Sequence, residues 1–82
     1  MNIQKNKTYR IKEITQNKPQ FMNFGLIENT IIKIMDHSQD NRTFYLEIMG
    51  FNRKVAISWD LLQQIVLEEM EEIKDDEENN KE

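Results

Sequence analysis

The chain has 82 residues, a formal net charge of −4 and no cysteine. A chain of this length forms one small domain with a modest hydrophobic core. The absence of cysteine excludes a disulfide framework and a thiolate metal site, and it favours a soluble cytoplasmic protein over a small secreted one. No apolar run approaches the length of about 20 residues that a membrane helix requires, and residues 1–7 do not resemble a signal peptide.

Charge is distributed unevenly along the chain. Residues 68–82 contain nine acidic residues and two lysines, a net charge of −7, whereas residues 1–67 contain nine basic and six acidic residues, a net charge of +3. An acidic stretch with few apolar residues is typical of a disordered, solvated tail. We therefore expect a folded domain over residues 1–68 and a disordered acidic tail over residues 69–82.

The first elements are predicted from two different periods. Residues 8–14 alternate with Tyr9 and Ile11 on one side, which predicts a strand, and Ile14 falls out of phase, which indicates a bulge or the end of that strand. Residues 17–25 predict one or two helical turns, because a proline in the first turn is tolerated and Gly25 can adopt the left-handed conformation that ends a helix.

Three further strands are predicted over residues 30–35, 43–49 and 53–57, with a polar loop over residues 36–42 and a tight turn at residues 50–52. Short loops between consecutive strands predict an antiparallel meander. Strands this short usually roll into a small barrel, which removes exposed edges. The side chains expected to face inward are Ile32, Ile34, Phe44, Leu46, Ile48, Val55 and Ile57.

The C-terminal third supports two interpretations. Ser58 is a good helix N-cap in both of them. A helical stripe, which consists of Leu62, Val66, Met70 and Ile73, predicts one long helix that extends to residue 74. The alternative is a short helix over residues 59–64 followed by a closing strand at residues 65–67. Helix propensity slightly favours the long helix, whereas closure of a barrel needs the strand.

The segment Q-F-M-N-F-G-L-I-E-N-T, residues 20–30, resembles the signature R-L-x-x-L-G-L-x-P-G-T of the FeoA family, ferrous iron transport protein A. Three positions match directly, namely Gly25, Leu26 and Thr30. Phe21 and Phe24 stand where the family prefers leucine. Glu28 and Asn29 replace the Pro-Gly turn, and asparagine tolerates the same left-handed geometry. Downstream, Gly50 and the segments 55–57 and 65–67 resemble later parts of the family pattern.

The resemblance implies a mainly β fold, a small SH3-like antiparallel β-barrel of about five strands. One short helix follows the first strand and another lies near the C-terminus, which favours the short helix and closing strand for residues 59–67. It also implies a cytoplasmic accessory protein that binds the cytosolic GTPase portion of FeoB, the membrane ferrous iron transporter, and regulates iron uptake without a cofactor. Whether uptake is activated or restrained, and the oligomeric state, stay open.

The candidate partner-binding residues are Phe21, Met22, Phe24, Leu26 and Trp59. A short helix cannot bury all of the first four, so two interpretations compete. Phe21, Phe24 and Leu26 could fill one end of the barrel, or Met22 and Leu26 could contribute an exposed apolar patch. Trp59 could be an interface anchor or could cap the core. The three turn residues, Gly25, Asn29 and Gly50, are expected to be structural.

A metal site is only weakly indicated. Asp36, His37 and Asp40 offer oxygen ligands and one imidazole, which could form a loose ferrous site. Asp36, Ser38, Asp40 and Glu47 also follow the ligand order of a calcium-binding EF-hand loop, but the required glycine is Asn41 and the flanks predict strands. We therefore expect a polar hairpin loop and no bound metal.

Other function classes have little support in the sequence. His37 is the single histidine and no phosphate-binding glycine motif is present, so we expect no enzymatic activity. Binding of nucleic acid by a small barrel is opposed by the acidic tail. A general protein- or peptide-binding adaptor stays open as an alternative, because SH3-like barrels have unrelated functions. The residues that could bind nucleic acid are Lys5, Lys7, Arg10, Lys12, Arg53 and Lys54, interleaved with Tyr9 and Phe51.

Overall fold

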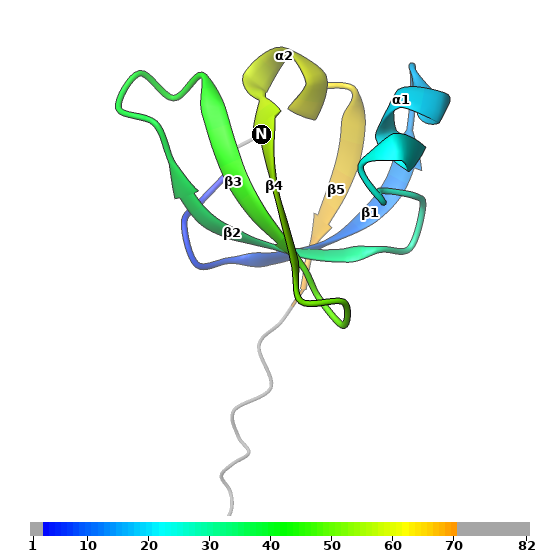
Figure 1. The fold of residues 1–82 in the computed structure, drawn as a ribbon, viewed down its shortest axis with the longest axis horizontal. Coiled ribbons are helices and arrows are strands. Elements are labelled where there is room, and N and C mark those ends of the chain that lie inside the picture. The colour runs from blue at the N-terminus through cyan, green and yellow to red at the C-terminus, as the bar shows by residue number, and fades with distance from the viewer. Residues whose placement is uncertain (1–2, 71–82) are drawn as a thin grey trace, which may run out of the picture.

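The computed structural model describes residues 3–70 and contains five strands and two short helices. This composition confirms the mainly β fold with one short helix after the first strand and one near the C-terminus (Figure 1). The elements in chain order are β1 (Thr8–Ile14), α1 (Lys18–Asn23), β2 (Ile31–His37), β3 (Thr43–Ile48), β4 (Arg53–Ser58), α2 (Trp59–Leu62) and β5 (Ile65–Glu69).

The five strands form one antiparallel sheet in the order β4-β3-β2-β1-β5. The sheet is strongly curved, as in a small SH3-like fold (Figure 1). However, β4 and β5 do not pair with each other, so the sheet stays open and the expected removal of both edges is wrong. Helix α2 connects these two edge strands and lies between their ends in Figure 1. The short connection therefore brings the edges toward each other without hydrogen bonds between them.

The concave side of the curved sheet holds the hydrophobic core. Every second residue of β3 is buried, and the alternation predicted for β2 and β3 is confirmed. The side chains of Ile32, Ile34 and Leu46 are fully buried. Val55 is only partly buried, whereas Ile57 of the same strand β4 belongs to the core. The whole core consists of Tyr9, Ile11, Ile14, Phe21, Leu26, Ile32, Ile34, Phe44, Leu46, Ile48, Ile57, Leu62, Ile65 and Leu67.

Two irregularities in the strand pairing explain where the inward–outward alternation of side chains is interrupted. The register between β1 and β5 shifts between Ile11 and Glu13, which returns Ile14 to the core and confirms the predicted bulge. A second shift occurs in β2 between Ile34 and Asp36. Strand β2 continues through this shift to His37, so the predicted loop over residues 36–42 begins too early.

The short helix and closing strand are confirmed, and the long helix to residue 74 is wrong. The hydroxyl of Ser58 accepts a hydrogen bond from the amide of Leu61 at 3.2 Å, which caps α2 as expected. Strand β5 then pairs with β1, buries Ile65 and Leu67 and turns Val66 outward. Glu69 still belongs to β5 and Met70 follows it, whereas residues 71–82 of the predicted tail lie outside the described residues.

Candidate interaction surface

Helix α1 and the turn that follows it are held by one shared acceptor. The carbonyl oxygen of Phe21 accepts hydrogen bonds from the amides of Phe24 and Leu26, both at 2.9 Å. Gly25 lies between these donors with a φ of +86°, so the predicted left-handed stop of the helix is confirmed. This geometry folds residues 21–26 back onto the sheet.

The fold divides the predicted binding residues of this segment between core and surface. Phe21 and Leu26 are completely buried, and Phe24 packs on the core while partly exposed. Leu26 therefore cannot contribute to an exposed patch. Phe21 and Leu26 are core side chains, in agreement with the interpretation that this segment fills one end of the fold. Met22 points outward and is 61% exposed, so it stays a candidate for contact with a partner.

Trp59 lies at the start of α2 and is half-buried against the core. Its ring packs on that of Phe44, with centroids 5.5 Å apart and planes tilted by 39°. The amide of Trp59 donates to the carbonyl of Arg42 at 2.8 Å, which fixes the position of the helix. Trp59 lines a small hollow with Ile3, Leu62, Gln63 and Ile65, a set that contains no residue of α1. The two predicted candidates, Met22 and Trp59, therefore do not line a common hollow there.

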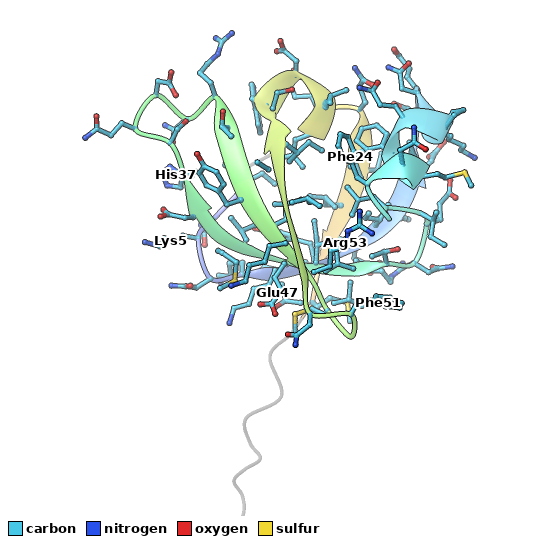
Figure 2. All side chains as sticks on the ribbon, in the orientation of Figure 1. Lys5, Phe24, His37, Glu47, Phe51 and Arg53 are labelled. Atoms are coloured by element: carbon cyan, nitrogen blue, oxygen red, sulfur yellow. The ribbon has the colours of Figure 1, made fainter. Side chains whose placement is uncertain are left out.

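A different apolar surface lies at the turn between β3 and β4. Phe51 is 75% exposed at the tip of this turn (Figure 2). It lines two adjoining hollows, one with Gly25 and Arg53 and the other with Ile27, Ile31 and Met49. We call this surface the turn patch; its members are Gly25, Ile27, Ile31, Met49, Phe51 and Arg53.

The turn patch is not among the binding surfaces that the sequence predicts. The sequence pattern marks Phe51 only as an aromatic residue among basic ones, and Ile27, Ile31 and Met49 are not among the predicted binding residues. A signal was nevertheless present, because Phe51 lies between Gly50 and Asn52, two residues typical of a tight turn. Both have positive φ values, +92° and +57°, and an aromatic side chain at the tip of such a turn has little to pack against.

The polar loop between β2 and β3 is closed by its own hydrogen bonds. The hydroxyl of Ser38 donates to Asp40 at 2.6 Å, and the amide of Arg42 donates to the same carboxylate at 3.1 Å. The amide of His37 donates to Asp36 at 2.8 Å, and Lys5 forms an ion pair with Asp36 at 3.7 Å. Ser38 lowers the pKa of Asp40, and the amide of His37, followed by Lys5, lowers the pKa of Asp36.

This arrangement does not support the ferrous or calcium site considered for the loop. Within residues 3–70, no three histidine, aspartate or glutamate side chains come close enough together to hold a metal ion. The carboxylates of Asp36 and Asp40 are instead engaged with donors of the loop and with Lys5. The geometry is that of a polar hairpin loop.

Half of the six basic residues considered for nucleic acid are engaged in ion pairs. Lys5, Lys7 and Arg10 form ion pairs with Asp36, Glu69 and Glu68, respectively. Tyr9, which was expected to interleave with them, is only 4% exposed and cannot stack on a base. Within the described residues, no helix is long and apolar enough to cross a membrane.

The curved five-stranded sheet, its two short helices and its exposed apolar surface define a small SH3-like β domain. Residues 1–69 match the FeoA domain, which covers all of the strands and helices described above. The chain therefore belongs to the FeoA family, and it is involved in ferrous iron transport. This family consists of small accessory domains and is not a known family of enzymes. No curated protein and no solved structure matches the chain.

Proposed function

We propose that this chain is a cytoplasmic accessory protein that binds the cytosolic GTPase portion of a FeoB-type ferrous iron transporter and regulates iron uptake. Membership in the FeoA family supports a role in this transport system. In this proposal, the folded domain, which includes β5, supplies the binding surface, and the acidic residues that follow β5 form a tail. The protein acts by binding and catalyses no reaction itself.

The exposure of large apolar side chains is the observation that carries the proposal. Met22, Ile27, Met49 and Phe51 are between 41% and 75% exposed, and the last three line the hollows of the turn patch. Exposed apolar side chains that gather on a small protein often mark a surface for another protein. A chain that acts as an accessory requires such a surface.

Titration of the isotope-labelled full chain with the cytosolic portion of the transporter from the same organism tests this function. The titration is followed by nuclear magnetic resonance, with and without guanine nucleotide. We expect saturable shifts of amides at one apolar surface. The absence of any shift at high partner concentration would contradict the proposal and would favour the general adaptor.

Met22→Asp tests whether the exposed surface of α1 contributes to transporter binding. Because Met22 is exposed, the substitution leaves the melting temperature unchanged, and it weakens the transporter contact if α1 takes part in it. Gln20→Asp is the matched control, since Gln20 is an exposed residue of the same helix and gains the same charge. Equal loss of binding in both variants would indicate a general charge effect.

A further inference from the structure

The turn patch combines an apolar hollow with a cation that has no ion-pair partner among the described residues. Phe51 lines both hollows, and Ile27 and Met49, which line one of them with it, are 50% and 41% exposed. The guanidinium of Arg53 lies over Gly25, where a Cβ would be 3.7 Å from Nη1. Figure 2 shows Arg53 between β4 and the end of α1, with Phe51 at the tip of the turn below it.

The charges around the turn patch leave it positive. In the part of the chain that the structure describes, Glu28 is the single carboxylate that lines the two hollows, and it already forms an ion pair with Lys18 at 3.0 Å. Among residues 3–70, neither Arg53 nor Lys54 forms an ion pair. Lys54 lies opposite Glu47 of β3, whereas Arg53 lines the hollow, where no described carboxylate is paired with it.

We propose that the turn patch binds an acidic segment of the partner protein, with one apolar side chain seated beside Phe51 and a neighbouring carboxylate on Arg53. This inference rests on the proposed function, and it names the surface and the chemistry of the segment bound there. A planar guanidinium binds a carboxylate through two parallel hydrogen bonds, which a lysine cannot do. An apolar side chain in the hollow removes Phe51 and Met49 from water, which stabilises the complex.

Three capped pentapeptides probe the recognition without the transporter. The first has four glutamates around a central leucine, the second replaces leucine with alanine, and the third replaces the glutamates with lysines. Each is titrated into the labelled full chain. The first peptide shifts the amides of Ile27, Met49 and Phe51. The alanine peptide binds about tenfold more weakly, as expected for a lost apolar side chain of this size, and the lysine peptide does not bind.

Two variants and two controls locate the site. Phe51→Ser and Arg53→Gln each weaken binding of the first peptide about fivefold or more, in line with the loss of an apolar contact or a charge-assisted hydrogen bond. Tyr45→Ser and Arg42→Gln remove another exposed aromatic ring and another cation without an ion pair, and they leave binding unchanged. All four changes are at exposed positions, so the fold is retained.

The same variants are then titrated with the cytosolic portion of the transporter. Loss of transporter binding in Phe51→Ser and Arg53→Gln alone supports both proposals. Transporter shifts confined to α1, with no peptide bound at the patch, overturn this inference and leave the proposed function intact. Peptide binding at the patch without any transporter binding overturns the proposed function instead.

Two other occupants would also overturn the inference. If the patch amides shift as the free protein is concentrated, a second copy of the chain occupies the surface. If added salt shifts the patch amides together with those of residues 71–82 in the free protein, the occupant is the acidic end of the same chain.

Discussion

Arg10 of β1 donates a hydrogen bond from Nη1 to the side-chain oxygen of Asn29 at 2.7 Å, and the same guanidinium forms an ion pair with Glu68 of β5. The backbone of Asn29 is tied to the same strand, because its amide donates to the carbonyl of Ile11 at 2.7 Å. Asn29 has a φ of +74° at the position where the family signature has glycine. One arginine therefore connects the loop before β2 with the last strand.

Substitution of Asn29 separates the two roles of this residue. Asn29→Gly keeps the left-handed backbone accessible and loses the hydrogen bond to Arg10, so we expect a loss of at most about 1 kcal/mol in the free energy of unfolding. Asn29→Ala loses the same bond and adds about 1–2 kcal/mol of backbone strain. Urea unfolding of both variants measures the difference. Equal stabilities would show that the conformation of residue 29 costs nothing.

Gly25 provides a test of backbone strain with little contribution from packing. A Cβ at this position would meet Ile48 at 3.5 Å, an ordinary contact, so the cost of a side chain arises from the φ of +86°. Gly25→Val should reduce the free energy of unfolding by a few kcal/mol, on the order of 1–3. Gly25→Asn is the control, because asparagine tolerates this region, and it should cost less. A valine variant as stable as the asparagine variant would refute the left-handed stop after α1.

Neighbouring residues of α1 should respond in opposite ways to truncation. Phe21 is completely buried, so Phe21→Ala should cost about 3–5 kcal/mol and leave the domain largely unfolded. Met22→Ala should change stability by less than about 0.5 kcal/mol, because the side chain is exposed. Thermal unfolding followed by circular dichroism measures both variants. Similar melting temperatures would contradict the burial of Phe21.

Three surface carboxylates predict a loss of stability in acid. Their ordinary pKa values are 3.8 for Asp36 and Asp40 and 4.5 for Glu28, and the pKa of each is lowered in the folded protein. The side chain of Lys18 is the main cause for Glu28. A lowered pKa stabilises the folded state at pH values above the unfolded pKa, and this contribution is lost as the pH falls through the folded pKa.

The free energy of unfolding should therefore decrease as the pH falls from these ordinary pKa values of 4.5 and 3.8 through the lower pKa values of the folded state. Asp36→Asn and Glu28→Gln should each flatten the acid limb of the profile, because the substituted side chain no longer titrates. Gln39→Asn, an exposed change in the same loop as Asp40, is the control. An unchanged slope in both carboxylate variants would show that these contacts have no effect in solution.

Most strands were predictable because alternation is a strong signal where one face is buried. The pattern of Phe44, Leu46 and Ile48 gave both the existence of β3 and its inward face. The out-of-phase position of Ile14 also located a bulge correctly. These predictions need only the chain itself, since the period of a half-buried strand is independent of its neighbours.

The last strand and the turn patch could not be predicted from local pattern. Val66 and Met70 are at helical spacing, and the residues around them have good helix propensity. The segment nevertheless pairs with the edge of β1 and forms strand β5. Pairing with a distant strand therefore overrides local preference. The turn patch joins the loop after α1 to the β3–β4 turn, and a surface assembled from separate loops has no periodic signature.

The seven left-handed backbone positions within residues 3–70 have a consequence for the unfolded chain. Five of the seven are asparagines, namely Asn6, Asn17, Asn29, Asn41 and Asn52, and two are glycines. Glycine would fit each turn with less strain, but it gives the unfolded chain more accessible conformations and thus a larger entropy to lose on folding. The chain has only two glycines in 82 residues, so its unfolded state has fewer accessible backbone conformations. The smaller loss of conformational entropy on folding offsets part of the strain in its turns.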